Sequence, residues 1–294
     1  MKGKTLSATR NRWGVIFILP ALVFFAVFGF FPFLYTFGVS LCKYDLISLK
    51  FVGMDNYLSL LEDDQFLNSL KITLYYVAGV TIPIWFLALG LALLLNTRIK
   101  FMGFYRTAYF IPVVMSLVGV SVIWTQLFHP YGLINQAIQW FTGHSLAVDW
   151  TTDESLALPG LILVNLWKMI GYYGVLYLAG LQGIPPEYHE AASIDGASGW
   201  KRFRHITWPL LIPTTVFIMI ISIINAFSAF VTIFMMTGGG PAEATRVLAL
   251  FIYQNAFQYS KMGTAASVSF YAFLIILILT FIQLRLSRSS EKIY

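Results

Sequence analysis

The sequence predicts an all-α, polytopic membrane protein with six transmembrane helices, both termini in the cytoplasm, and a helical loop between the fourth and fifth spans. Of its 294 residues, 58% are hydrophobic and only 11% are charged, whereas a soluble domain carries about 25% charged residues. A chain with so few charges lacks the polar surface that a water-soluble protein of this size needs. A soluble enzyme, a disordered chain and a fibrous protein are therefore excluded.

Six apolar stretches are long enough to cross a bilayer, which takes about 20 residues. The core of each stretch lacks Asp, Glu, Lys and Arg, except for the fourth, which contains Lys168. Proline and glycine interrupt several stretches, and a bilayer tolerates them where neighbouring helices satisfy the freed backbone groups. The predicted spans are residues 14–41, 70–95, 105–128, 157–181, 209–237 and 263–285.

The first apolar stretch follows a basic N-terminus, as in a signal peptide. It is nevertheless close to 30 residues long, lacks an Ala-x-Ala-like cleavage site and is followed by five more apolar stretches. We expect it to remain as the first span. Residues 1–13 and 287–294 are then cytoplasmic tails, and residues 14–286 form the transmembrane domain.

The charges are distributed unequally between the two sides. Thirteen of the 19 basic residues fall on the side of the termini, and nine of the 13 acidic residues fall on the other side. Since cytoplasmic loops are enriched in Lys and Arg, both termini are predicted to be cytoplasmic. The net charge of +6 thus reflects topology, and no nucleic-acid partner is expected. The basic residues on the cytoplasmic side are Lys2, Lys4, Arg10, Arg12, Arg98, Lys100, Arg106, Lys201, Arg202, Arg204, Arg285, Arg288 and Lys292.

Two of the external loops contain candidate short helices. The first is expected around residues 54–61. The second covers residues 246–259, where apolar residues recur at helical spacing. Because this segment is too short for a seventh span, we predict an interfacial or re-entrant helix.

The sequence motifs for nucleotide binding and for zinc-dependent catalysis are incomplete. Gly3-Lys4-Thr5 lacks the glycine that a phosphate-binding loop needs five residues earlier, and the helix at His189-Glu190 lacks the second histidine of a zinc protease. The single cysteine, Cys42, excludes an internal disulfide and a cysteine-based metal cluster. All 13 acidic residues lie outside the spans, which weakens a proton-coupled mechanism. Energy for transport then comes from outside the chain, or the protein is a passive channel.

The third cytoplasmic loop, residues 182–208, is longer than a simple connection requires. Pro186 can start a helix, because proline is favoured in the first turn, and Glu190 follows near its positive end. Gly196 breaks this helix. A second, basic helix then leads to Pro209, where the next span begins. The loop is thus predicted to be a helix–turn–helix that docks onto a partner.

This loop carries the pattern Glu-Ala-Ala, three residues, Gly, nine residues, Ile, any residue, Leu, Pro, with Trp208 in place of the leucine. In this it resembles the permease subunits of binding-protein-dependent ABC importers, in the carbohydrate-uptake branch that includes the maltose and glycerol-3-phosphate permeases. The likeness extends over about residues 14–286. It implies that this stretch is the permease domain. The segments that carry it are Leu178–Pro185, Glu190-Ala191-Ala192, Gly196, Ile206, Pro209, Tyr131–Asn135 and Gly239-Gly240-Pro241.

The resemblance implies that the loop seats in a groove of a cytoplasmic ATPase. Glu190 would make a polar contact with the ATPase, Gly196 would allow close backbone approach, and the aromatic side chains would anchor the second helix. The alternative is that these residues only cap and turn an exposed loop. The implied coupling residues are Glu190, Ala191, Ala192, Asp195, Gly196, Trp200 and Phe203.

The resemblance to the maltose member also implies a sugar pocket between the fourth and fifth spans. Lys168 lies roughly 15 Å inside the membrane at a rise of about 1.5 Å per residue, and a charge there usually faces a cavity or a partner. It either contacts the cargo or bonds to backbone carbonyls or to a partner permease. Lys168, Met169 and Asn225 differ from the maltose member, so the sugar need not be maltose. The implied pocket residues are Asn165, Lys168, Met169, Tyr172, Ser222 and Asn225.

By the same resemblance, the chain is no enzyme and holds no cofactor or metal, because ATP and Mg would sit on the partner ATPase. The expected partners are a second permease subunit, two ATPase subunits, an extracytoplasmic solute-binding protein, a carbohydrate and the lipid bilayer. The expected location is a bacterial or archaeal cytoplasmic membrane. Two alternatives stay open at this point: a glycerophosphodiester or polyol as cargo, and a secondary transporter or channel that acts alone.

Overall fold

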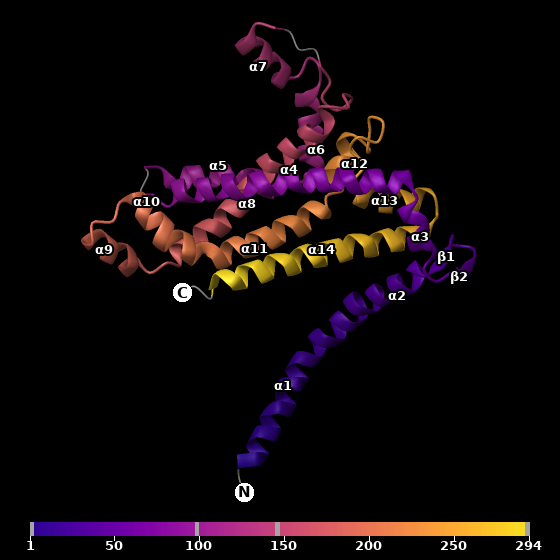
Figure 1. Ribbon diagram of the computed structural model, residues 1–294, viewed down its shortest axis with the longest axis horizontal. Coiled ribbons are helices and arrows are strands. Elements are labelled where there is room, and N and C mark those ends of the chain that lie inside the picture. The colour runs from indigo at the N-terminus through magenta and orange to yellow at the C-terminus, as the bar shows by residue number, and fades with distance from the viewer. Residues whose placement is uncertain (1–2, 98–99, 145–147, 292–294) are drawn as a thin grey trace. The chain divides into compact units, whose positions relative to one another are not determined.

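A computed structural model describes residues 3–97, 100–144 and 148–291. Within these residues the regular secondary structure is helical apart from one two-stranded sheet (Figure 1). Lys2, Arg98 and Lys292, which the topology prediction used, lie outside the described residues, as do the side chains of both predicted tails. The elements in chain order are α1 (Gly3–Phe25), α2 (Phe31–Ser40), β1 (Cys42–Tyr44), β2 (Leu49–Phe51), α3 (Asp55–Leu61), α4 (Asp64–Leu95), α5 (Met102–Val114), α6 (Leu117–Phe128), α7 (Leu133–Thr142), α8 (Ala157–Gln182), α9 (Pro186–Ile194), α10 (Gly199–Arg202), α11 (Trp208–Phe227), α12 (Val231–Met236), α13 (Leu248–Tyr253) and α14 (Met262–Glu291).

The chain packs as two compact units, Met1–Glu62 with Ile252–Phe270, and Asp63–Phe251 with Tyr271–Tyr294. In the first unit, α1 continues through one π-helical turn into α2, and the antiparallel strands β1 and β2 follow. The Ser40 hydroxyl at the end of α2 hydrogen-bonds the Tyr57 hydroxyl of α3 at 2.6 Å. The predicted short helix around residues 54–61 is therefore confirmed as α3, and a hydrogen bond holds it against the end of the first span.

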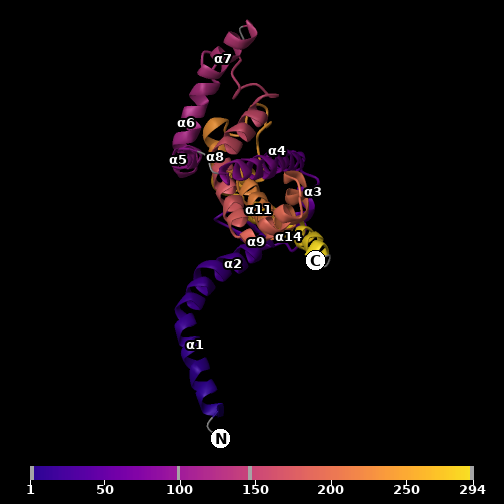
Figure 2. The ribbon, with the colours of Figure 1, turned by 90° about the vertical axis from the view of Figure 1, so that its left-hand side faces the viewer.

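The core of the second unit consists of α4, α8 and α11, which pack side by side (Figures 1 and 2). Small residues let these helices approach closely, as is usual in membranes. A Cβ atom at Gly174 of α8 would lie 2.9 Å from Leu91 Cδ2 of α4, and one at Gly180 would lie 2.6 Å from Thr214 Oγ1 of α11. The three helices thus form a tight frame for the polar side chains between them.

Among the described residues, six helical stretches are long and apolar enough to cross a membrane, as predicted. An even number of crossings places both termini on the same side. The third stretch differs in detail, because the predicted span 105–128 is two helices, α5 and α6, separated by the extended residues Met115 and Ser116. The six stretches are Gly14–Ser40, Asp64–Leu95, Leu117–Thr142, Ala157–Gln182, Gly199–Met236 and Met262–Arg285.

The short helix predicted at residues 246–259 is present as α13 followed by a π-helical turn, Gln254–Gln258. It is too short to span a bilayer. Leu248 and Phe251 of α13 are buried, which accounts for the helical spacing of apolar residues in this segment.

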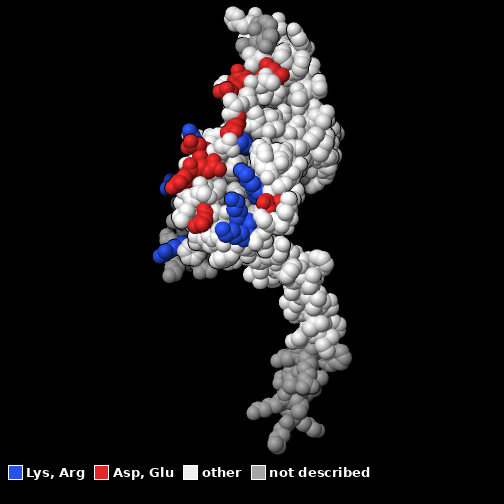
Figure 3. All heavy atoms as spheres, turned by 90° about the vertical axis from the view of Figure 1, so that its right-hand side faces the viewer, with Lys and Arg blue, Asp and Glu red and all other residues white. Residues whose placement is uncertain are grey.

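Most of the described residues on the face in Figure 3 carry no charge. Large apolar side chains are exposed instead: Phe17 is 80% exposed, Phe86 71% and Phe28 69%. Water would not favour so much apolar surface. Lipid or other protein subunits must therefore cover it.

Candidate functional site: a cytoplasmic docking loop and a polar face within the helix bundle

The docking loop begins with α9, which has Pro186 in its first turn. Gly196 ends the helix with a φ of +71°, a conformation that glycine adopts without strain. The N–H of Gly196 donates to the Ser193 carbonyl at 3.2 Å, and the N–H of Ala197 donates to the Ala192 carbonyl at 2.9 Å. These bonds satisfy carbonyls at the helix end, as in a glycine C-cap. The predicted turn at Gly196 is confirmed.

The second half of the loop starts at Ser198, whose hydroxyl accepts from the Lys201 N–H at 3.4 Å and caps α10. The Trp200 and Phe203 rings stack with centroids 5.6 Å apart. Arg202 Nη1 donates to the Ser193 hydroxyl at 3.0 Å and links the two helices. The predicted helix–turn–helix is thus present, and its own contacts hold it together.

The loop presents apolar and acidic side chains to the outside. No residue of α9 is buried, Ile194 is 87% exposed and Trp200 is 68% exposed. Glu190 is exposed as well, and a Cβ atom at Gly196 would meet nothing within 4 Å. Exposed large apolar residues beside an open glycine are typical of a surface that another protein covers.

Lys168 of α8 is buried, with 7% of its surface exposed. Its ammonium donates to the carbonyls of Pro112 at 2.9 Å, Val113 at 3.3 Å and Met115 at 2.7 Å. An ammonium has three donors, so this chain satisfies all of them. Of the two alternatives that the sequence left open, the structure therefore contains the bond to backbone carbonyls.

The three carbonyls lie at the break between α5 and α6. The last carbonyls of a helix have no partner within it, and they form the negative end of the helix dipole. Met115 is extended, with ψ of 144°, so the helix cannot continue to satisfy them. Lys168 thus caps α5 from a neighbouring helix. The sequence offered backbone carbonyls as one kind of partner for Lys168 but could not identify them, because the cation and its acceptors are more than 50 residues apart.

Three of the predicted pocket residues, Asn165, Met169 and Tyr172, recur along one face of α8 at helical spacing. All three are half-buried, so part of each side chain is accessible. Asn225 of α11 is exposed, and its side-chain amide donates to the Tyr173 hydroxyl at 3.1 Å. This bond joins α11 to α8 next to Tyr172, whose ring contacts the Tyr173 ring. We call the face of α8 that carries Asn165, Met169 and Tyr172 the polar face.

Ser222 is the most enclosed of the predicted pocket residues, with 2% exposure. Its hydroxyl accepts from Trp85 Nε1 of α4 at 2.8 Å and donates to the Met219 carbonyl at 2.9 Å. Sequence reasoning missed Trp85, because no motif marks it and its partner lies 137 residues away. Trp85 fixes the position of α4 against α11 beside the polar face.

No group of His, Cys, Asp or Glu within residues 3–97, 100–144 and 148–291 could hold a metal ion. Six apolar helices, an exposed docking loop and a polar face between the helices instead define a polytopic subunit of a membrane transport system. Residues 8–292 match the model of the family described as "binding-protein-dependent transport system inner membrane component". The chain belongs to this family.

The comparisons with individual proteins agree with the family. The chain is 33% identical over 285 residues to the lactose transport system permease protein LacF of Rhizobium radiobacter, covering 96% of this chain and 95% of LacF. It is also 33% identical over 283 residues to the sn-glycerol-3-phosphate transport system permease protein UgpA of Agrobacterium fabrum, covering 92% of each chain.

A solved structure shares the fold. The chain superimposes with a TM-score of 0.83 on a chain of a bacterial alginate ABC transporter in complex with a periplasmic protein bound to an alginate pentasaccharide. The two chains are 22% identical, and the match covers 96% of each. At this identity the likeness establishes the fold alone.

Family membership decides between classes of protein. The chain is a multi-pass permease subunit of an ABC transport system in the inner membrane, and it is not an enzyme. A secondary transporter or channel that works alone does not fit a component of a binding-protein-dependent system.

Proposed function

We propose that this chain forms part of the membrane pathway of an ATP-driven importer for a sugar or oligosaccharide. The observation that favours a neutral cargo is the environment of Lys168. Its three N–H donors all bond to backbone carbonyls, so none is left for an anion. The other residues of the predicted pocket, which are Asn165, Met169, Tyr172, Ser222 and Asn225, are all uncharged. Neutral amides, hydroxyls and an aromatic ring suit a neutral, hydroxylated cargo.

A phosphate-containing cargo is the second candidate. It is favoured by UgpA, the sn-glycerol-3-phosphate permease, which is as similar to this chain as the lactose permease LacF. An anion in the membrane interior needs a positively charged partner. Lys168 is already bonded within the chain, which weighs against this candidate and favours the sugar.

The proposed coupling residues lie on the exposed docking loop. Glu190, Ala191, Ala192, Asp195 and Gly196 would meet a groove of the ATPase, while the stacked Trp200 and Phe203 would anchor the second helix of the loop. ATP and Mg would bind to that ATPase and not to this chain.

The proposed complex contains this chain, a second permease subunit, two ATPase subunits and an extracytoplasmic solute-binding protein. Residues 14–286 would form the permease domain, with cytoplasmic tails at 1–13 and 287–294. The exposed apolar surface of α1 and α2 supports a partner in the membrane. The alginate transporter of the same fold forms a complex with a periplasmic protein, which supports the binding-protein partner.

The cargo is tested by purifying the native complex with its solute-binding protein and titrating that protein by calorimetry. At least one neutral mono- or oligosaccharide should bind to the solute-binding protein and be taken up by vesicles that contain the complex. Binding of sn-glycerol 3-phosphate, with no response to neutral sugars, would support the phosphate candidate and contradict the sugar.

The pocket is tested by N165A and Y172A in the same vesicles. Each should raise the cargo concentration for half-maximal uptake about fivefold, because a lost hydrogen bond costs about 1 kcal/mol. Leu163→Ala is the matched control, since Leu163 lies exposed on another face of α8 and should have no such effect. Unchanged uptake by both pocket variants would remove these residues from the proposed site.

A further inference from the structure

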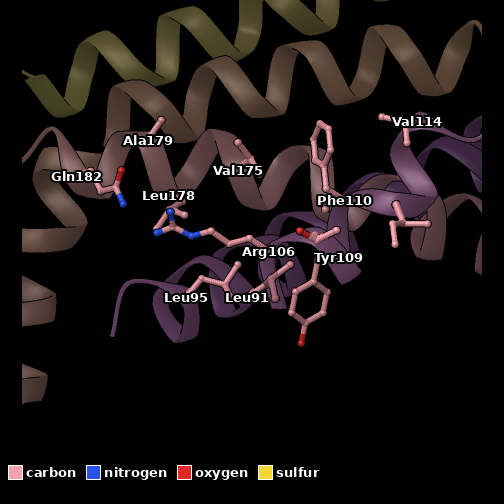
Figure 4. A pocket seen from close by; sticks show the side chains of 13 residues that line it. Leu91, Leu95, Arg106, Tyr109, Phe110, Val114, Val175, Leu178, Ala179 and Gln182 are labelled. Carbon is pink, nitrogen blue, oxygen red and sulfur yellow. The ribbon is translucent and has the colours of Figure 1, made fainter. Parts of the chain in front are cut away.

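A groove of about 570 Å³ lies between α4, α5 and α8 (Figure 4), and none of the predicted pocket residues lines it. Most of the side chains along it are apolar. It is lined from three helices by Leu91, Leu95, Phe110, Val114, Val175 and Leu178. A groove of this size and character is suited to an apolar chain.

Two of the helices that line the groove approach each other closely. A Cβ atom at Gly171 of α8 would overlap the Tyr109 carbonyl oxygen of α5, at 2.1 Å, so only glycine allows this contact. The Lys168 cap lies one turn further along α8 and holds the same two helices. The groove therefore ends near the middle of the bundle.

The length of the groove corresponds to one leaflet. Along α8 it extends from Gly171 to Gln182, the last residue of the helix. Eleven steps of about 1.5 Å give about 16 Å, and half of a hydrocarbon core of about 30 Å is about 15 Å. Gln182 leads into the docking loop, which contains Lys201, Arg202 and Arg204. The positive-inside rule therefore places this leaflet on the cytoplasmic side.

The cytoplasmic end of the groove is positively charged. Arg106 of α5 is exposed, and within the part of the chain that the structure describes it forms no ion pair. Figure 4 shows its side chain extending along the groove past Leu178 toward Gln182. A guanidinium binds phosphate through parallel N–H donors, and the side-chain amide of Gln182 supplies another donor.

We propose that this groove binds an anionic phospholipid of the cytoplasmic leaflet, with the phosphate at Arg106 and Gln182 and an acyl chain along α8. Basic pockets between transmembrane helices on the cytoplasmic side are suited to anionic headgroups. An apolar segment of a partner subunit would fill the same groove but would leave the guanidinium without an anion. The charge at the end of the groove therefore favours the lipid.

The test uses the native complex in nanodiscs that contain phosphatidylglycerol with a photoactivatable acyl chain. After irradiation, mass spectrometry maps the labelled residues, and a phosphatidylcholine probe with the same chain serves as reference. The phosphatidylglycerol probe should label α5 and α8 several-fold more than the reference. R106Q should remove this excess, and V175W should lower labelling by both probes because the indole fills the groove.

Two matched controls accompany these variants. R285Q removes another charge at a cytoplasmic helix end, and L163W adds an indole on another face of α8; both should leave labelling of the groove unchanged. Equal labelling by the two probes in the unaltered complex would overturn the proposal, as would an excess that persists in R106Q. Crosslinking of a V175C variant to the partner permease, with no lipid label in the groove, would overturn it in favour of a subunit interface.

Discussion

Replacing Gly196 by aspartate, or Glu190 by lysine, is expected to leave the complex assembled while ATP hydrolysis no longer drives uptake. Gly196 has a φ of +71°, so a non-glycine residue there is strained by about 1–2 kcal/mol. The space around it is open, however, so the new side chain clashes with nothing in this chain and meets the ATPase instead. Loss of the charged contact of Glu190 with a partner costs about 2–5 kcal/mol. Uptake should therefore fall by more than about tenfold, since 1.4 kcal/mol is one factor of ten.

The measurement compares ATP hydrolysis and uptake in reconstituted vesicles, with pull-down of the ATPase to verify assembly. Gly199→Ala is the matched control. Gly199 is also an open position in the loop, but it lacks the positive φ, so alanine should be tolerated there. Normal uptake by both Gly196→Asp and Glu190→Lys would contradict the assignment of this loop as the coupling element.

Replacing Lys168 by methionine is expected to destabilise the complex and to lower uptake. The change leaves the carbonyls of Pro112, Val113 and Met115 without their donor inside the protein. Each buried polar group that loses its partner costs about 1–3 kcal/mol. At about 2–4 °C per kcal/mol for a chain of this size, the thermal midpoint of the complex should fall by roughly 5 °C or more.

Lys168→Arg should recover much of the loss, because a guanidinium can still donate to carbonyls. The control is Lys71→Met on α4, where the ammonium is exposed and lies 5.9 Å from the Tyr75 ring. That variant should keep the midpoint within about 1 °C, as surface substitutions usually change stability by less than 0.5 kcal/mol. If Lys168→Met changes the apparent affinity for cargo but leaves the midpoint unaltered, then Lys168 binds cargo and our account of it is wrong.

Much of the fold could be predicted because its signals are local. Uncharged runs of membrane length mark the spans, and the loops sort by charge. Pro186 and Gly196 mark the start and end of α9 through the backbone conformations that these residue types favour. The docking loop was therefore predictable both in position and in form.

The remaining features depend on contacts between distant segments. The span predicted at residues 105–128 is broken after Val114, and the freed carbonyls are bonded by Lys168, which is more than 50 residues away. Likewise, Trp85 and Ser222 bond across 137 residues. The groove beside Arg106 is lined by residues of α4, α5 and α8. None of these pairings leaves a periodic or compositional trace, so only the structure could reveal them.

The central claim is that this chain transports only as part of an ATP-driven complex. The most direct measurement is uptake by vesicles that contain the purified permeases, with and without the ATPase, and with the solute-binding protein on the side opposite to the docking loop. We predict uptake only when the ATPase and Mg-ATP are present on the side of the docking loop. Equal flux of the cargo through vesicles that lack the ATPase would contradict the account.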